Sequence, residues 1–248
     1  MATLILHGVP SSHPVLTVEA GLRHKGLDFE RVDLPIGDHG DAVAEIYGDG
    51  ARTVPGLLLD GEPVHGSIGI LRRVEELVPE PSLYPADVAE QVRETEEWGS
   101  AVIQSMARHF VFGALHFRPE SMGTFAGGGA LDPVATDFAI TYIRRAWRHV
   151  GITAAGLAEQ LAELPAALDR TDALAGAGVL GGEQPTAADL QLGSSYRLML
   201  NLGDLVPLLE GRTAERIARR WFPDYPGEVP AGAFPAAWVP DAAATPAR

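Results

Sequence analysis

The chain has no cysteine, which excludes a disulfide framework, a thiolate metal site and Cys-x-x-Cys redox chemistry. Positive charge is scarce: 19 Lys and Arg residues stand against 33 Asp and Glu, so the formal charge is −14 and the pI is near 4.9. This balance argues against nucleic acid and an anionic membrane surface as partners. No apolar run approaches the ~20 residues that cross a bilayer, and the start of the chain lacks the basic region of a signal peptide. We therefore expect a cytoplasmic protein.

The most informative stretch of the sequence is a hairpin that leads into a helix. The apolar run Gly56–Leu59 is typical of a buried strand. Asp60-Gly61 predicts a tight turn, because both residue types tolerate a positive φ, and residues 63–65 form the returning strand. Gly66-Ser67 then opens a helix with an apolar face made of Ile70, Leu71, Val74 and Leu77.

Two places on this element are suited to hold a ligand. Val54-Pro55 is a candidate cis bond ahead of a strand, and it would turn the backbone N–H and C=O of Val54 outward, where they can pair with an extended peptide. Ser67 stands at a helix N-terminus, whose amides and partial positive charge favour a carboxylate. One end of the element is therefore suited to a peptide backbone and the other to an acid group.

Upstream of the hairpin the pattern alternates strand and helix. Ser11-Ser12 ahead of Pro14 predicts a helix start, and Lys25-Gly26 predicts its end. Around this helix the sequence favours strands at 3–6 and 27–34 and a short helix at 42–47. This order predicts an α/β unit of the thioredoxin type over residues 1–78.

The rest of the chain has a helical pattern. A proline-rich linker at 79–86 precedes an all-α domain at 87–225 and a proline-rich strap at 226–248, whose end beyond about Asp241 is expected to be loose. Thr186 and Asp189 have the spacing of a capping box at the start of the most apolar helix. Residues 122–129 are expected to form a loop, and a helix over 153–174 to be interrupted at Pro165. The remaining helices are predicted at 87–112, 133–149, 186–202 and 213–221.

These motifs, in this order, resemble those of the glutathione transferase superfamily over roughly residues 2–221. The resemblance implies a thioredoxin-like N-terminal domain, an all-helical C-terminal domain, glutathione as co-substrate without a metal, and a homodimer. Tyrosine-type members have a tyrosine where this chain has His7, and cysteine-type members need a cysteine. The stretch from Leu6 to Ser12 is similar to the serine-type classes, theta, zeta and bacterial relatives.

Within this resemblance, Ser12 stands where the serine-type classes keep the hydroxyl that stabilises the glutathione thiolate, with Ser11 as second choice. The alternative is that both serines only cap the helix. Val54 would hold the cysteinyl backbone of glutathione and Ser67 its γ-glutamyl carboxylate. Gly66 replaces the usual Gln or Glu, and Thr53 replaces a common Gln or Lys. The implied glutathione site comprises His13, Thr53, Val54, Pro55, Gly66 and Ser67.

A small-molecule electrophile would bind against the first long helix of the second domain, where Gln104, Arg108 and His109 are the candidate pocket residues. Met106 and Phe110 lie on the same helix, and the alternative interpretation is that they are core residues. The function implied is conjugation of glutathione to that electrophile. Three alternatives stay open: a different low-molecular-weight thiol, a zeta-like cis–trans isomerisation, and a catalytically silent binding or regulatory protein.

Overall fold

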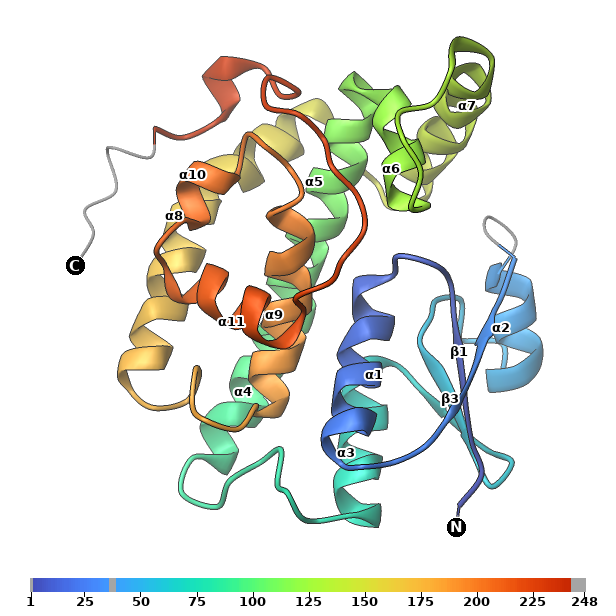
Figure 1. The fold of residues 1–248 in the computed structure, drawn as a ribbon, viewed down its shortest axis with the longest axis vertical. Helices are drawn as coiled ribbons and strands as arrows, with labels where there is room; N and C mark the ends of the chain where they lie inside the picture. Colours follow the sequence, from blue (N-terminus) through green and yellow to red (C-terminus); the bar gives the residue numbers. More distant parts are fainter. Residues whose placement is uncertain (1, 36–38, 242–248) are drawn as a thin grey trace.

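A computed structural model describes residues 2–35 and 39–241 (Figure 1). The N-terminal part is built on a mixed sheet with the order β2-β1-β3-β4. Strands β1 and β2 are parallel, whereas β1 and β3, and β3 and β4, are antiparallel. The strands are β1 (Leu4–Gly8), β2 (Glu30–Asp33), β3 (Gly56–Leu59) and β4 (Glu62–His65).

Three helices accompany this sheet: α1 (His13–His24), α2 (His39–Tyr47) and α3 (Ser67–Leu77). Figure 1 shows α1 and α3 between the sheet and the helical part of the chain, with α2 on the opposite face of the sheet. Alternate residues of β1, Leu4 and Leu6, are buried, as a strand with one covered face requires. The core of this part consists of Leu4, Leu6, Val15, Val18, Leu22, Leu57, Leu59, Ile70 and Val74.

The remainder is helical around α9 (Ala187–Met199), which packs against α1, α4, α5 and α11. The predicted capping box is present: the Asp189 N–H donates to Thr186 Oγ1, and the Thr186 N–H donates to Asp189 Oδ2. The other elements of this part are α4 (Ala89–Trp98), the π-helix η1 (Gly99–Ile103), α5 (Gln104–Phe117), η2 (Pro119–Ser121), α6 (Met122–Phe125), α7 (Pro133–His149), α8 (Ala154–Gly176), α10 (Val206–Leu209), α11 (Thr213–Trp221) and η3 (Ala236–Trp238).

This arrangement confirms the predicted fold class, a thioredoxin-like N-terminal part followed by helices. The assignment of residues 1–78 and 87–225 as separate domains stays a prediction. Several local expectations were wrong. The 87–112 helix is divided by η1, and the 122–129 loop contains α6. Helix α8 runs through Pro165 without a break. Leu77 is 36% exposed and does not complete the apolar face of α3.

After α11 the C-terminal strap passes close to the loop before α1 and then runs along the helices, away from the N-terminal part (Figure 1). The Tyr225 hydroxyl donates to the Ser11 carbonyl, at 2.5 Å, and Phe234 is buried in the helical core. The expected packing of the strap is therefore correct for its described part, whereas the loose end expected beyond Asp241 lies outside the described residues.

Candidate functional site

The loop between β1 and α1 places its two serines in different environments. Ser11 has a left-handed backbone, with φ of 58°, and its hydroxyl donates to the Phe125 carbonyl at 2.5 Å. Ser12 is the N-cap residue of α1, yet its side chain makes no capping hydrogen bond. The expectation that both serines act as side-chain caps is therefore wrong. In the described chain no hydrogen bond engages the Ser12 hydroxyl, which leaves it available to a ligand at the start of a helix.

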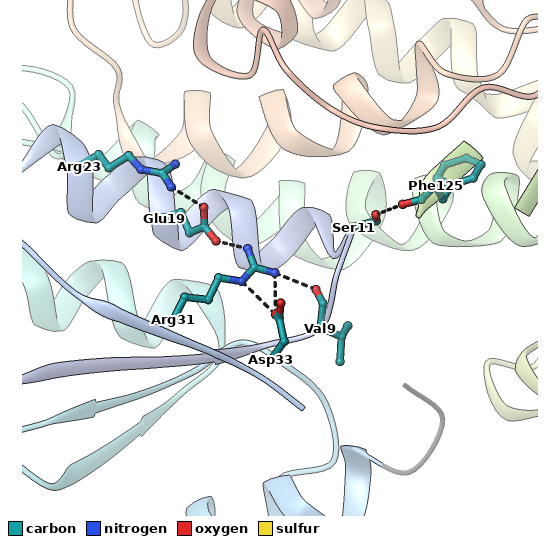
Figure 2. Close-up of polar contacts among 7 residues, drawn as sticks. All are labelled: Val9, Ser11, Glu19, Arg23, Arg31, Asp33 and Phe125. Carbon is teal, nitrogen blue, oxygen red and sulfur yellow. Dashed lines mark hydrogen bonds and ion pairs between the residues drawn. The ribbon is translucent and has the colours of Figure 1, made fainter. Parts of the chain in front are cut away.

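An ion-pair network holds this loop in place (Figure 2). Arg31 on β2 donates to the Val9 carbonyl at 3.2 Å and pairs with Asp33 and with Glu19 of α1. The same Val9 carbonyl accepts the N–H of Ser12, at 3.3 Å. Figure 2 shows Glu19 between the guanidinium groups of Arg23 and Arg31. Arg31 thus ties the loop that carries Ser12 to the strand beneath it.

The turn before β3 presents free backbone groups. The Val54–Pro55 bond is cis, as the sequence predicts. Within the described residues, no hydrogen bond engages the N–H or the C=O of Val54. The neighbouring Thr53 carbonyl is instead paired with His65 Nε2, at 2.6 Å. The Val54 backbone is therefore free to pair with an extended ligand.

At the other end of this hairpin, Gly66 precedes α3 with φ of 82°, a conformation that favours glycine. Ser67 is buried, and its hydroxyl donates to Gln191 Oε1 on α9 at 2.9 Å. The amide of Gln191 donates in turn to Gln104 Oε1 at 2.7 Å. The Ser67 side chain is thus occupied, while the amides of the first turn of α3 remain for a ligand.

The helical part contributes one face of α5 and the π-turn before it. Gly99 begins η1, and a Cβ there would clash with Leu192, so the helix approaches α9 closely at this point. Single π-turns are frequent at functional sites. Ser100, Gln104 and Arg108 follow at intervals of four residues, which places them one above another.

The turn before β3, the start of α3 and one face of η1 and α5 line a cavity of about 260 Å³, together with Pro14 of α1. Its floor and walls come from both parts of the chain, so neither part forms it alone. The lining residues are Pro14, Thr53, Val54, Pro55, His65, Gly66, Ser67, Ile68, Gly69, Ser100, Gln104 and Arg108.

The structure brings most of the predicted site residues to this cavity. Thr53, Val54, Pro55, Gly66, Ser67, Gln104 and Arg108 line it. Ser11, Ser12 and His109 are not among the lining residues, and His109 Nδ1 pairs instead with Gln160 on α8 at 2.9 Å. Met106 and Phe110 are core residues, as their alternative interpretation holds.

His13 is only 5% exposed and is not among the residues that line the cavity. Burial, reinforced by Arg108, lowers the pKa of His13 to about 3, so the ring is neutral. Its Nε2 has no hydrogen-bond partner among the described residues.

Sequence reasoning missed Ser100 and Gln191. Both depend on contacts between segments distant in sequence, and the only local signal for Ser100 was its spacing of four from Gln104. His7 stands where tyrosine-type members have their tyrosine, and it offers no hydroxyl to a thiol. Its Nδ1 pairs with the Tyr47 hydroxyl at 2.6 Å, and burial lowers the pKa of its ring.

The sequence and the fold are both similar to those of known proteins. Residues 6–82 match the family model of the glutathione S-transferase N-terminal domain. Several solved structures share the fold across nearly the whole chain. A glutathione transferase from Phanerochaete chrysosporium aligns with a TM-score of 0.61 at 16% identity, covering 88% of this chain and 96% of its own.

Two bacterial proteins align similarly. A beta-etherase from Sphingobium sp. strain SYK-6 gives a TM-score of 0.57 at 21% identity, covering 89% of this chain and 90% of its own. A glutathione S-transferase from Rhodospirillum rubrum gives 0.55 at 20% identity, covering 95% and 98%. No curated protein matches at the sequence level. The family match thus concerns the N-terminal domain, and the solved structures show that the chain as a whole has the fold of glutathione S-transferases. Among the described residues no helix is both long and apolar enough to span a bilayer.

Proposed function

We propose that the protein is a glutathione-dependent transferase that activates the thiol of glutathione for attack on a small electrophile. The observation that supports this most directly is the cavity between the two parts of the chain. It joins the unpaired backbone of Val54 and the start of α3 to a polar face of α5. A peptide-like thiol and a second substrate can therefore lie side by side there. A homodimer remains an expectation from the family resemblance, and a cytoplasmic location remains one from the composition of the sequence.

In this proposal the chain's own groups divide the work. The N–H and C=O of Val54 pair with the cysteinyl backbone as an added strand would. The free amides at the start of α3 hold the γ-glutamyl carboxylate, because a helix N-terminus favours an anion. Since the Ser67 hydroxyl already donates to Gln191, the backbone amides carry most of this contact.

Ser12 supplies the chemistry. Its unengaged hydroxyl donates to the sulfur, and the start of α1 adds a partial positive charge, so the thiolate is favoured over the thiol. The thiol proton passes to solvent. The sulfur lone pair then forms a bond to the electrophilic carbon, and the leaving group departs with the electrons of its bond. Ser11 is the weaker candidate because its hydroxyl is held by Phe125.

A catalytically silent binding protein is the second candidate, and one observation favours it. The Ser67 hydroxyl is buried and satisfied within the chain, so it offers less to a carboxylate than a free hydroxyl would. This second candidate predicts that glutathione binds weakly or not at all. The same titration therefore separates the two candidates.

Calorimetric titration with glutathione tests the proposal. We expect binding at micromolar to low-millimolar strength, with Ser12→Ala leaving affinity nearly unchanged while lowering turnover and raising the pKa of the bound thiol. Ser67→Ala should weaken this binding. Ser194→Ala is its matched control, because the Ser194 hydroxyl also makes a buried contact, from α9 to Thr17 of α1 at 2.7 Å, but does not line the cavity. Absence of heat with glutathione would contradict the proposal. Equal turnover and thiol pKa in Ser12→Ala and wild type would remove Ser12 from it.

A further inference from the structure

Arg108 is a half-buried cation that pairs with no other described residue. Other partly buried arginines of the chain are bonded: Arg31 to Glu19 and Asp33, and Arg212 to Asp169 and Asp172. Within the described residues, no hydrogen bond or ion pair engages the Arg108 guanidinium. Burial alone lowers its pKa, and no neighbouring carboxylate opposes that shift. A buried charge without a counter-ion is costly, so the arrangement needs a physical reason.

The location of Arg108 supplies that reason. It lines the cavity from the α5 side, one helical turn beyond Gln104, while Val54 and Ser67 line it from the N-terminal part. No Asp or Glu occurs among the described residues that line this cavity, and Arg108 is their one Lys or Arg. His13, which interacts with Arg108, is neutral and adds no charge of its own. The cavity therefore has an unbalanced positive charge at its α5 wall.

We propose that the electrophile of this site carries a carboxylate, which pairs with the Arg108 guanidinium when the electrophile enters the cavity. The inference rests on the proposed function, in which glutathione occupies the Val54 and α3 side. A guanidinium matches a carboxylate with two parallel hydrogen bonds, and such pairs are stronger where water is excluded. The pair would also orient the reactive carbon relative to the sulfur.

The same cation has one competing use, a carboxylate of glutathione itself. The two sources are separated by comparing ligands that share the glutathione part and differ only at the far end. S-hexylglutathione and its analogue with a terminal carboxylate on a chain of equal length form such a pair. Calorimetric titration of the wild-type protein with glutathione and with both analogues gives three affinities, none of which depends on turnover.

In the wild-type protein we expect the carboxylated analogue to bind about tenfold more tightly than S-hexylglutathione, the size of one charge-assisted contact. Arg108→Gln should abolish this preference and leave the affinity for glutathione nearly unchanged. Arg108→Lys should keep part of the preference, because a lysine retains the charge but loses the two-bond geometry. Arg148→Gln removes the same charge from an exposed position on α7 outside the cavity and should change none of the affinities.

Equal affinities for the two analogues in the wild-type protein would overturn the inference without any variant, even if Arg108→Gln did not fold. A loss of affinity for glutathione and both analogues by the same factor in Arg108→Gln would overturn it too, since Arg108 would then serve glutathione. In either case glutathione binding by the wild type would leave the proposed function intact. If none of the three ligands bound the wild type, the proposed function would fall and this inference with it.

Discussion

Replacing Asp189 with alanine tests whether a buried carboxylate organises the start of α9. Its Oδ1 accepts the Gly181 N–H at 2.8 Å, and its Oδ2 accepts the N–H and the hydroxyl of Thr186, both at 3.0 Å. Asp189 is fully buried, so the two N–H groups would lose their partner without water to replace it, whereas the Thr186 hydroxyl can still donate to the Val179 carbonyl, at 3.4 Å. At about 1–1.5 kcal/mol for each N–H hydrogen bond and less for that of the hydroxyl, the loss is about 2–4 kcal/mol. The cap alone would account for about 0.5–2 kcal/mol.

The assay is thermal and urea unfolding followed by circular dichroism. For a chain of this length a loss of about 3 kcal/mol lowers Tm by roughly 6–12 °C. Thr186→Ser keeps the hydroxyl and is the matched control, with little change expected. Burial raises the pKa of Asp189, which shows that desolvation opposes its ionised form. A loss below about 1 kcal/mol in Asp189→Ala would refute the reasoning, because the hydrogen bonds would then only balance that desolvation.

Three further perturbations have expected outcomes. Burial raises the pKa of Glu96 to about 7 from 4.5, so the folded chain binds this proton more tightly than the unfolded chain does. Stability should therefore fall by at most about 3 kcal/mol as pH rises from about 4.5 through about 7, and urea titrations of Glu96→Gln should lack that fall. Gly56→Ala should lower the free energy of unfolding by about 1–3 kcal/mol, since the added Cβ would clash with the Tyr47 ring. Gly69→Ala is the control, because a Cβ fits at Gly69, and it should not lower Tm. Arg31→Met should lower the free energy of unfolding by about 2 kcal/mol, because it leaves buried Glu19 with Arg23 alone. It should also lower turnover with glutathione, whereas Arg31→Lys should not. Unchanged stability and turnover in Arg31→Met would contradict the role of the network.

Features set by neighbouring residues were predictable from the sequence. Asp60-Gly61 forms its turn with both residues at positive φ, as these residue types allow. The Thr186–Asp189 capping box and the start of α3 at Ser67 also follow from spacing of three or four residues. The turn and the capping box satisfy their own backbone groups, so they depend little on contacts with distant segments.

Features that depend on contacts between distant segments were not predictable. Arg108 and His109 were equal candidates for the electrophile pocket, yet consecutive residues of a helix point about 100° apart, so only one can face a given cavity. In the structure Arg108 lines the cavity, whereas His109 pairs with Gln160 on α8. Likewise, nothing near Ser67 in the sequence indicates Gln191, which occupies its hydroxyl from 124 positions away.

The hydrogen-bond chain from Ser67 through Gln191 to Gln104 links the candidate site to the packing of the two parts of the molecule. Ser67 belongs to α3, Gln191 to the central helix α9, and Gln104 to the wall of the cavity. A ligand carboxylate that took the Ser67 hydroxyl would leave Gln191 Oε1 without its donor, and this cost would offset most of the free energy of the new hydrogen bond. Binding through the backbone amides of α3 avoids this cost. The structure therefore favours a ligand that leaves the Ser67 side chain in place, and a loss of affinity in Ser67→Ala would arise from altered α3–α9 packing as well as from any direct hydrogen bond to the ligand.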